Sequence, residues 1–224
     1  MALTDNLVSY WKLDESSGNA ADSVGSNTGV NTSVTYSAGK INNGGAFNGS
    51  SSFLNCGSSI NLRDNFSISM WAKSNTSLGT LISRELSGSN YPQFSIFVGS
   101  YKASLEVFSS NSASPTANIF TTSSLSATYS MITVTRDGTN VKIYFNGILE
   151  ATAAWTLQQK TSTDAITIGR NSTSGSRYLD GNADEVGIWD RALSASEITE
   201  LYNGGAGLTY PFTTANQANF LAFF

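Results

Sequence analysis

Residues 166–205 decide the fold, with the sequence ITIGRNSTSGSRYLDGNADEVGIWDRALSASEITELYNGG. The stretch predicts a strand, a loop, a second strand and one short helix. Ser194 can accept a hydrogen bond from the amide of Glu197, and Glu197 can accept one from the amide of Ser194, as in a capping box. An apolar helix face follows, and Gly204 supplies a left-handed stop. A single helix after a long series of strands is therefore expected.

Apolar and polar residues alternate through most of the chain before this stretch. Phe66, Ile68 and Met70 share one face of an expected strand, with serines between them. The dipeptide Asn146–Gly147 is the strongest signal for a hairpin turn between two strands. Many short strands with Gly-, Ser- and Asn-rich turns predict an all-β fold, a two-sheet antiparallel β-sandwich with one short C-terminal helix.

Five blocks of sequence, in this order, resemble the laminin-G-like, concanavalin A-like jelly rolls. They are LVSYWKLDESSGNAADSVGSNTG (7–29), GKINNGGAFNGSSSFLNCG (39–57), FSISMWAKS (66–74), YSMITVTRDGTNVKIYFNGILEAT (129–152) and GNADEVGIWDRALSASEITELY (181–202). The resemblance covers roughly residues 7–205 and implies a concanavalin A-like jelly roll. The fold leaves the ligand open, because this architecture hosts lectins, glycanases, protein-binding modules and structural domains.

Composition favours one β-rich domain with a nearly neutral surface. The chain has 224 residues, 12% charged residues and a net charge of −4. Its 12 basic residues are scattered, so a phosphate-binding stripe is absent and nucleic acid is not an expected partner. The expected organisation is a jelly-roll domain over 1–207 and a C-terminal tail over 208–224.

The cysteine and histidine content limits which disulfides, metal sites and catalytic groups the chain can form. Cys56 stands alone, which excludes an intrachain disulfide and favours burial as a small hydrophobic residue. Histidine is absent, which removes the commonest zinc ligand and the commonest neutral-pH general base.

The N-terminus has no signal-peptide pattern and no segment has the roughly 20 apolar residues of a membrane span. We expect an extracellular or virion-associated protein that lacks a Sec signal.

The resemblance implies a structural calcium ion. In this family the Asp of the "DEV" strand, here Asp184, commonly binds it, and Asp22 is the natural second carboxylate. Gly44 can offer a backbone carbonyl and Asp14 can complete the shell, since calcium takes six to eight oxygen ligands. The alternative for each Asp is a turn-capping residue that accepts hydrogen bonds from nearby amides.

An enzyme is not expected. Related jelly-roll glycanases carry carboxylates at alternate positions of one strand, so that they face one groove. Asp180 and Asp184 are separated by Asn182 at the alternate position, and Glu106 and Glu150 stand alone in their strands. A Ser-His-Asp triad is impossible without histidine.

Loop aromatic residues are the candidate ligand-binding groups. Sugars stack on aromatic faces, with neighbouring polar groups fixing the hydroxyls. The candidates are Trp155, Tyr91, Tyr101 and Tyr178. For Trp155 the alternative is packing over the sheet edge. Trp11, Trp71 and Trp189 occupy strand positions that the family fills, so packing is expected for them.

Two functions remain open. The first is a non-catalytic, calcium-stabilised module that binds a glycan or cell-surface polymer, as a virion or cell-surface component. The second is a structural protein, such as a virion decoration subunit, that associates with itself or a virion partner through residues 211–224. That segment ends in NFLAFF, and exposed apolar ends mark interaction sites. The alternative for the tail is a strap packed on its own domain.

Overall fold

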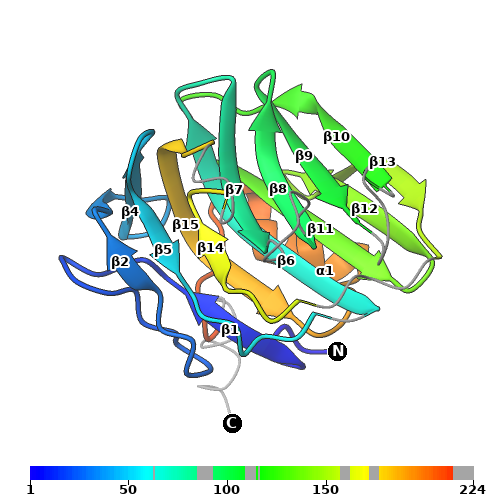
Figure 1. Cartoon of the computed structure of the whole chain (residues 1–224). Coiled ribbons are helices and arrows are strands. Elements are labelled where there is room, and N and C mark those ends of the chain that lie inside the picture. Colours follow the sequence, from blue (N-terminus) through cyan, green and yellow to red (C-terminus); the bar gives the residue numbers. More distant parts are fainter. Residues whose placement is uncertain are drawn as a thin grey trace, which may run out of the picture.

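In this computed structural model the chain folds into two antiparallel sheets that pack face to face (Figure 1). The structure describes residues 1–62, 64–84, 93–108, 115, 117–156, 162–171 and 177–213. These residues contain fifteen strands and one α-helix. The predicted all-β sandwich with one short C-terminal helix is confirmed.

The front sheet, which faces the viewer in Figure 1, has the strand order β10-β9-β8-β7-β14-β5-β2. Its strands are β2 (Val30–Thr32), β5 (Phe53–Asn55), β7 (Leu78–Arg84), β8 (Phe94–Gly99), β9 (Lys102–Val107), β10 (Ala117–Ser124) and β14 (Ile166–Ile168). A two-residue turn joins β8 to β9. Ser100 and Tyr101 both have positive φ there, 51° and 64°, as a tight hairpin turn requires.

The back sheet has the order β13-β12-β11-β6-β15-β4-β3, with β1 also paired to β15. Its strands are β1 (Leu7–Trp11), β3 (Thr35–Ala38), β4 (Asn43–Asn48), β6 (Asn65–Ser74), β11 (Ser130–Asp137), β12 (Asn140–Phe145), β13 (Ile148–Ala154) and β15 (Asp180–Trp189). The predicted turn at Asn146–Gly147 joins β12 to β13, with φ of 51° and 81°. This hairpin prediction is confirmed.

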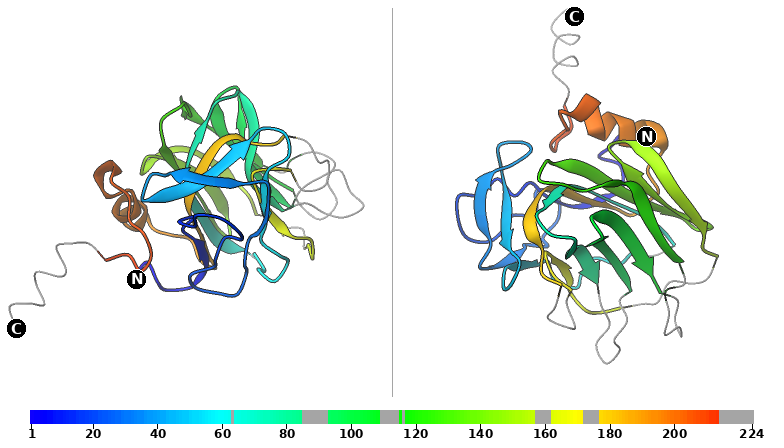
Figure 2. Two further views of the ribbon diagram at one scale, coloured as in Figure 1. Left: turned by 90° about the vertical axis from the view of Figure 1, so that its left-hand side faces the viewer. Right: turned by 90° about the horizontal axis from the view of Figure 1, so that it is seen from above.

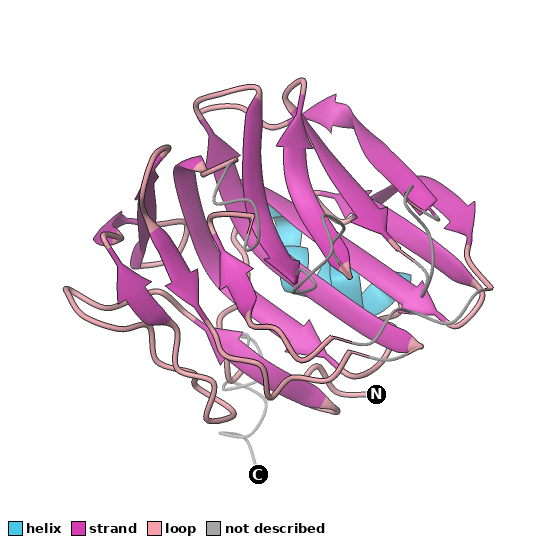
Figure 3. Cartoon of the chain, in the orientation of Figure 1, coloured by secondary structure: helices cyan, strands magenta, loops and turns pink. Residues whose placement is uncertain are grey.

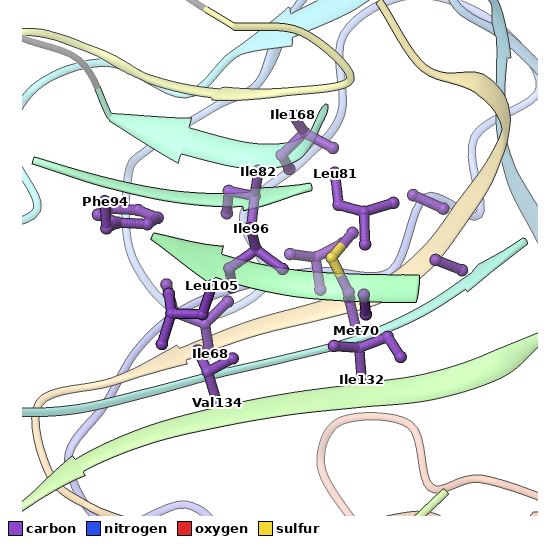
Figure 4. Close-up of a cluster of buried hydrophobic side chains, with 14 of the residues drawn as sticks. Ile68, Met70, Leu81, Ile82, Phe94, Ile96, Leu105, Ile132, Val134 and Ile168 are labelled. Carbon is purple, nitrogen blue, oxygen red and sulfur yellow. The ribbon is translucent and has the colours of Figure 1, made fainter. Parts of the chain in front are cut away.

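The core between the sheets is built from the inward residue of each alternating pair. Ile68 and Met70 of β6 and Ile132 of β11 come from the back sheet, and side chains such as Ile96 come from the front sheet (Figure 4). Cys56 lies in the same core with 0% of its surface exposed, as predicted. Burial raises the pKa of its thiol well above the ordinary value.

The helix α1 (Ala195–Tyr202) lies against the outer side of the back sheet (Figures 2 and 3). Its predicted capping box is present: the Glu197 amide donates to Ser194 Oγ at 3.3 Å, and the Ser194 amide donates to Glu197 Oε2 at 2.8 Å. The helix ends one residue earlier than predicted. Asn203 takes the left-handed conformation with φ of 47°, and Gly204 follows with φ of 61°.

A second apolar cluster fills the space between α1 and the back sheet. Its buried residues are Leu3, Tyr10, Trp71, Met131, Tyr144, Trp189, Leu193, Ile198, Leu201, Leu208 and Phe212. Trp71 and Trp189 are therefore packing residues, as predicted, and Trp11 packs in the main core. We call this helix-covered side of the back sheet the covered face.

The first part of the predicted tail lies on the covered face. Leu208 and Phe212 are buried there, and the Phe212 ring lies 5.2 Å from Tyr10 and 6.2 Å from Trp189, between ring centroids. This part of the tail is a strap on its own domain, one of the two alternatives. Residues 214–224 lie outside the described residues, so assembly through the tail stays a prediction. Among the described residues no helix is long and apolar enough to cross a membrane.

Candidate functional site

Asp22 lies in the loop that follows β1, and its carboxylate caps the turn formed by the next few residues. Its carboxylate accepts four backbone N–H groups at 3.0–3.1 Å, donated by Tyr10, Val24, Gly25 and Asn27. Burial raises the pKa of this carboxyl, but these amide donors outweigh burial and hold the pKa below its ordinary value. The turn-capping interpretation of Asp22 accounts for these contacts.

Asp184, in β15, is fully buried and also accepts backbone amides. Its Oδ2 accepts from Lys40 at 2.7 Å and Ile41 at 2.9 Å, and its Oδ1 accepts from Glu185 at 2.9 Å. Burial raises its pKa to about 8, against the opposing effect of the amide donors. Asp184 therefore fixes the 39–41 segment to β15.

The residues predicted to bind calcium do not fit a shared calcium site. Asp14 accepts the amide of Asn43 at 3.1 Å, and Gly44 lies in the ladder between β4 and β3. N–H groups point at the oxygens of both Asp22 and Asp184, where a cation needs oxygens free of such donors. Within the described ranges, no group of three or more His, Cys, Asp or Glu residues could hold a metal. Calcium binding by the chain stays a prediction.

Trp155 is not a sugar platform, which corrects the prediction. Only 1% of its surface is exposed, and it belongs to the core. The Arg136 guanidinium lies 3.9 Å from the centroid of its ring. A platform must offer a free ring face to solvent, so the packing alternative holds.

The three predicted tyrosines have different positions. Tyr91 lies outside the described residues. Tyr101 is 46% exposed at the turn between β8 and β9. Tyr178 is half-buried, and its carbonyl lies beside Gly79. Of these candidates, Tyr101 is the one with a substantially exposed side chain among the described residues.

The covered face holds a buried carboxyl beside a very small cavity. Glu185 is 3% exposed, and its Oε2 accepts the Tyr10 hydroxyl at 2.5 Å. Burial raises the pKa of Glu185 to about 7. The cavity, lined also by Trp71 and Leu208, has about 10 Å³ of room. This is space for one water molecule and excludes a sugar.

The outer side of the front sheet presents a different surface. Phe120 of β10 lies opposite Ser104 of β9, which lies opposite Phe97 of β8, so the three form a row across the strands. Lys102 and Glu106 lie two residues from Ser104 on either side and share its face. Phe120 is 55% exposed, an unusual position for a large apolar side chain on a strand.

A polar pair accompanies this aromatic row. Asn118 Nδ2 donates to Glu106 Oε1 at 3.3 Å. Burial raises the pKa of Glu106, and the charge of Arg177 works in the opposite direction. Amide and carboxylate groups beside an exposed ring are what hydroxyl-rich ligands need. We call this surface the front face; it consists of Phe97, Lys102, Ser104, Glu106, Asn118 and Phe120.

The front-face residues were missed in the sequence, although one signal was present. Ala117 and Ile119 occupy the inward positions of β10, so Phe120 falls in the outward phase. A Phe in the polar phase of a strand is a reason to expect a binding surface.

Comparison with known proteins agrees with this architecture. Residues 47–199 match the family described as the concanavalin A-like lectin/glucanases superfamily. The chain belongs to this superfamily. Among curated proteins the comparison gives no match.

Several solved structures share the superfamily fold. The binding domain of paraclostridial mosquitocidal protein 1 has 19% identity and a TM-score of 0.70, covering 90% of this chain and 52% of that one. Domain 4 of AbnA, an extracellular GH43 arabinanase from Geobacillus stearothermophilus, was solved with arabinotriose. It has 18% identity and a TM-score of 0.68, covering 87% of this chain and 97% of that one.

The botulinum neurotoxin serotype G binding domain has 21% identity and a TM-score of 0.65, covering 88% of this chain and 50% of that one. The chain thus spans about half the length of the two toxin binding domains. At these identities, the likeness shows the fold alone.

Proposed function

We propose that the front face binds carbohydrate and that the chain is a non-catalytic carbohydrate-binding module. The observation that carries the proposal is the 55% exposed ring of Phe120, on the outer side of the front sheet beside the Asn118–Glu106 pair. An exposed ring covers the C–H face of a sugar, and the polar pair bonds its hydroxyls. The arabinotriose bound to the similarly folded AbnA domain supports this class of ligand.

The carboxylates of the front face argue against hydrolysis. Glycoside hydrolysis uses two carboxyl groups, about 5 to 9.5 Å apart across the scissile bond. On β9 the outward residues are Lys102, Ser104 and Glu106, and on β10 they include Asn118 and Phe120. Among these outward positions Glu106 is the one carboxyl group, so these positions of β9 and β10 do not supply a catalytic pair.

The test is calorimetric titration of a panel of oligosaccharides into the wild type and Phe120→Ala. We expect the variant to bind at least about tenfold more weakly, a loss of roughly 1.4 kcal/mol. Ile148→Ala is the matched control, because Ile148 is an exposed apolar residue (68%) on the other sheet. Unchanged affinity in Phe120→Ala, or an equal loss in Ile148→Ala, would refute the front face as the binding site.

A further inference from the structure

Three cations of the front sheet lie over aromatic rings. Lys102 Nζ lies 5.4 Å from the centroid of Phe120, and the Arg177 guanidinium lies 5.5 Å from that of Phe97. Further along the same sheet, the Arg170 guanidinium lies 3.5 Å from the centroid of Phe53. Each ring attracts its cation through the negative potential of its face.

The ion pairs between described residues are Arg136–Asp64, Lys142–Asp137 and Arg191–Glu197, and none of them includes Lys102, Arg170 or Arg177. The chain has 16 acidic and 12 basic residues, so carboxylates outnumber cations. Arg177 is near enough to Glu106 for its charge to lower the pKa of that carboxyl, without an ion pair between them. Lys102 and Arg177 therefore contact rings of the front sheet and stay outside the ion pairs.

An aromatic ring leaves a cation free to bind an anion. A carboxylate partner would use the N–H groups of an arginine, whereas a ring contacts only the flat side of the guanidinium. Arg177 carries the planar fork of N–H groups that matches a carboxylate with two parallel hydrogen bonds. Lys102 likewise keeps N–H donors that are not directed at its ring.

The spacing of the two cation–ring pairs suits a chain-like ligand. Phe120 on β10 and Phe97 on β8 lie in one row with β9 between them, a separation of about 10 Å at the usual strand spacing. A ligand running across the strands would meet Lys102 with Phe120 first, and Arg177 with Phe97 second.

We propose that the front face selects an acidic glycan, a polysaccharide with uronic acid residues, whose carboxylates bind Lys102 and Arg177. The proposal rests on the proposed function and names the class of its ligand. Phe120 and the Asn118–Glu106 pair would bind the neutral parts of the sugars, and the two cations would bind the carboxylates. The carboxylate is favoured over sulfate because the Arg177 fork is planar.

The test compares tetragalacturonate, a neutral tetrasaccharide, a sulfated tetrasaccharide and single-stranded DNA by calorimetric titration. We expect tetragalacturonate to bind most tightly, and its affinity to fall as salt is raised because salt screens the attraction between the cations and the carboxylates. Arg177→Gln and Lys102→Gln should each weaken it about tenfold, or 1.4 kcal/mol, which is a larger loss than either variant causes for the neutral sugar.

The matched control is Lys73→Gln, in which Nζ lies 4.9 Å from the centroid of Tyr129 on the other sheet. It should bind tetragalacturonate like the wild type. The inference is overturned if the neutral, sulfated or DNA ligand binds as tightly, or if Lys73→Gln loses as much affinity as Arg177→Gln. If no oligosaccharide binds at all, the proposed function itself fails, which is a different outcome from neutral-only binding.

Discussion

The covered face and the front face are the outer sides of two similar sheets, but they have different surroundings. On the covered face, α1 and the strap around Leu208 and Phe212 bury the aromatic residues Tyr10, Trp71 and Trp189. On the front face, the ring of Phe120 stays exposed beside cations that have no recorded ion pair. Outward aromatic residues therefore stabilise the fold on one side and remain available to a ligand on the other.

This difference gives a rule for separating structural from functional residues in the chain. A substitution on the covered face removes buried contacts and should cost stability. On the front face, substitution of Phe120 removes a ring that is 55% exposed to water and should cost only binding. Opposite results would show that the two faces have been assigned the wrong way round.

The largest expected effect is that of Trp189→Ala. The Trp189 side chain is fully buried, and its Nε1 donates to the Leu3 carbonyl at 2.7 Å. We expect the free energy of unfolding in urea to fall by about 3 to 5 kcal/mol. Phe120→Ala should change it by less than about 0.5 kcal/mol. Equal losses in the two variants would remove the distinction between the faces.

The second effect concerns the pH dependence of the covered face. Glu185 has a folded-state pKa of about 7 against an ordinary value of 4.5, because it is buried. Its contribution to stability is complete below pH 4.5 and is lost as the pH rises toward 7, a loss of about 3 kcal/mol. Glu185→Gln should therefore reduce the fall in the free energy of unfolding over this window, measured by urea unfolding from pH 4.5 to 8, while Asp184, with its pKa of about 8, keeps its own share.

Asp184 and Glu185 are adjacent buried carboxyls, so they titrate as a pair. The Asp184 oxygens accept amide N–H groups, whereas Glu185 Oε2 accepts the Tyr10 hydroxyl. Burial raises both pKa values, to about 8 for Asp184 and about 7 for Glu185, so the two groups share the loss of stability with rising pH. Glu150→Gln is a control of opposite sign, because amide and hydroxyl donors outweigh burial and lower the pKa of Glu150, and its stabilisation is lost as the pH falls. A pH profile unchanged by Glu185→Gln would contradict the raised pKa of Glu185.

The smallest effect in this series is that of Ser194→Ala at the start of α1. The substitution removes the side-chain oxygen that accepts the Glu197 amide. We expect a loss of about 1 kcal/mol in the free energy of unfolding, with no change in ligand affinity. Loss of ligand binding in a folded Ser194→Ala protein would show that the helix and the front face are coupled.

The fold was predictable because its signals are local. The capping box at Ser194 and Glu197, the turn at Asn146–Gly147 and the alternation of Phe66, Ile68 and Met70 each lie within a few residues. Each dictates one element, and the elements then leave few arrangements that bury all the apolar faces. The structure differs only in detail, such as the helix end at Asn203 rather than Gly204.

The site was less predictable because it depends on contacts between distant segments. Trp155 follows a hairpin in a polar stretch, and only the fold brings it under Arg136. Residue type suggested a role for the acidic candidates, but their surroundings decide it. Two of the three amides that donate to Asp184 lie more than 140 positions away in the sequence. Phe120 differs, because its outward phase was visible in the sequence.

The single cysteine offers a way to time the opening of the sandwich. Cys56 lies in the main core with no exposed surface, and burial disfavours its thiolate. A thiol reagent can therefore modify it only in molecules whose sheets have separated. The labelling rate in water then reports how often the intact protein opens, without denaturant and without an engineered cysteine.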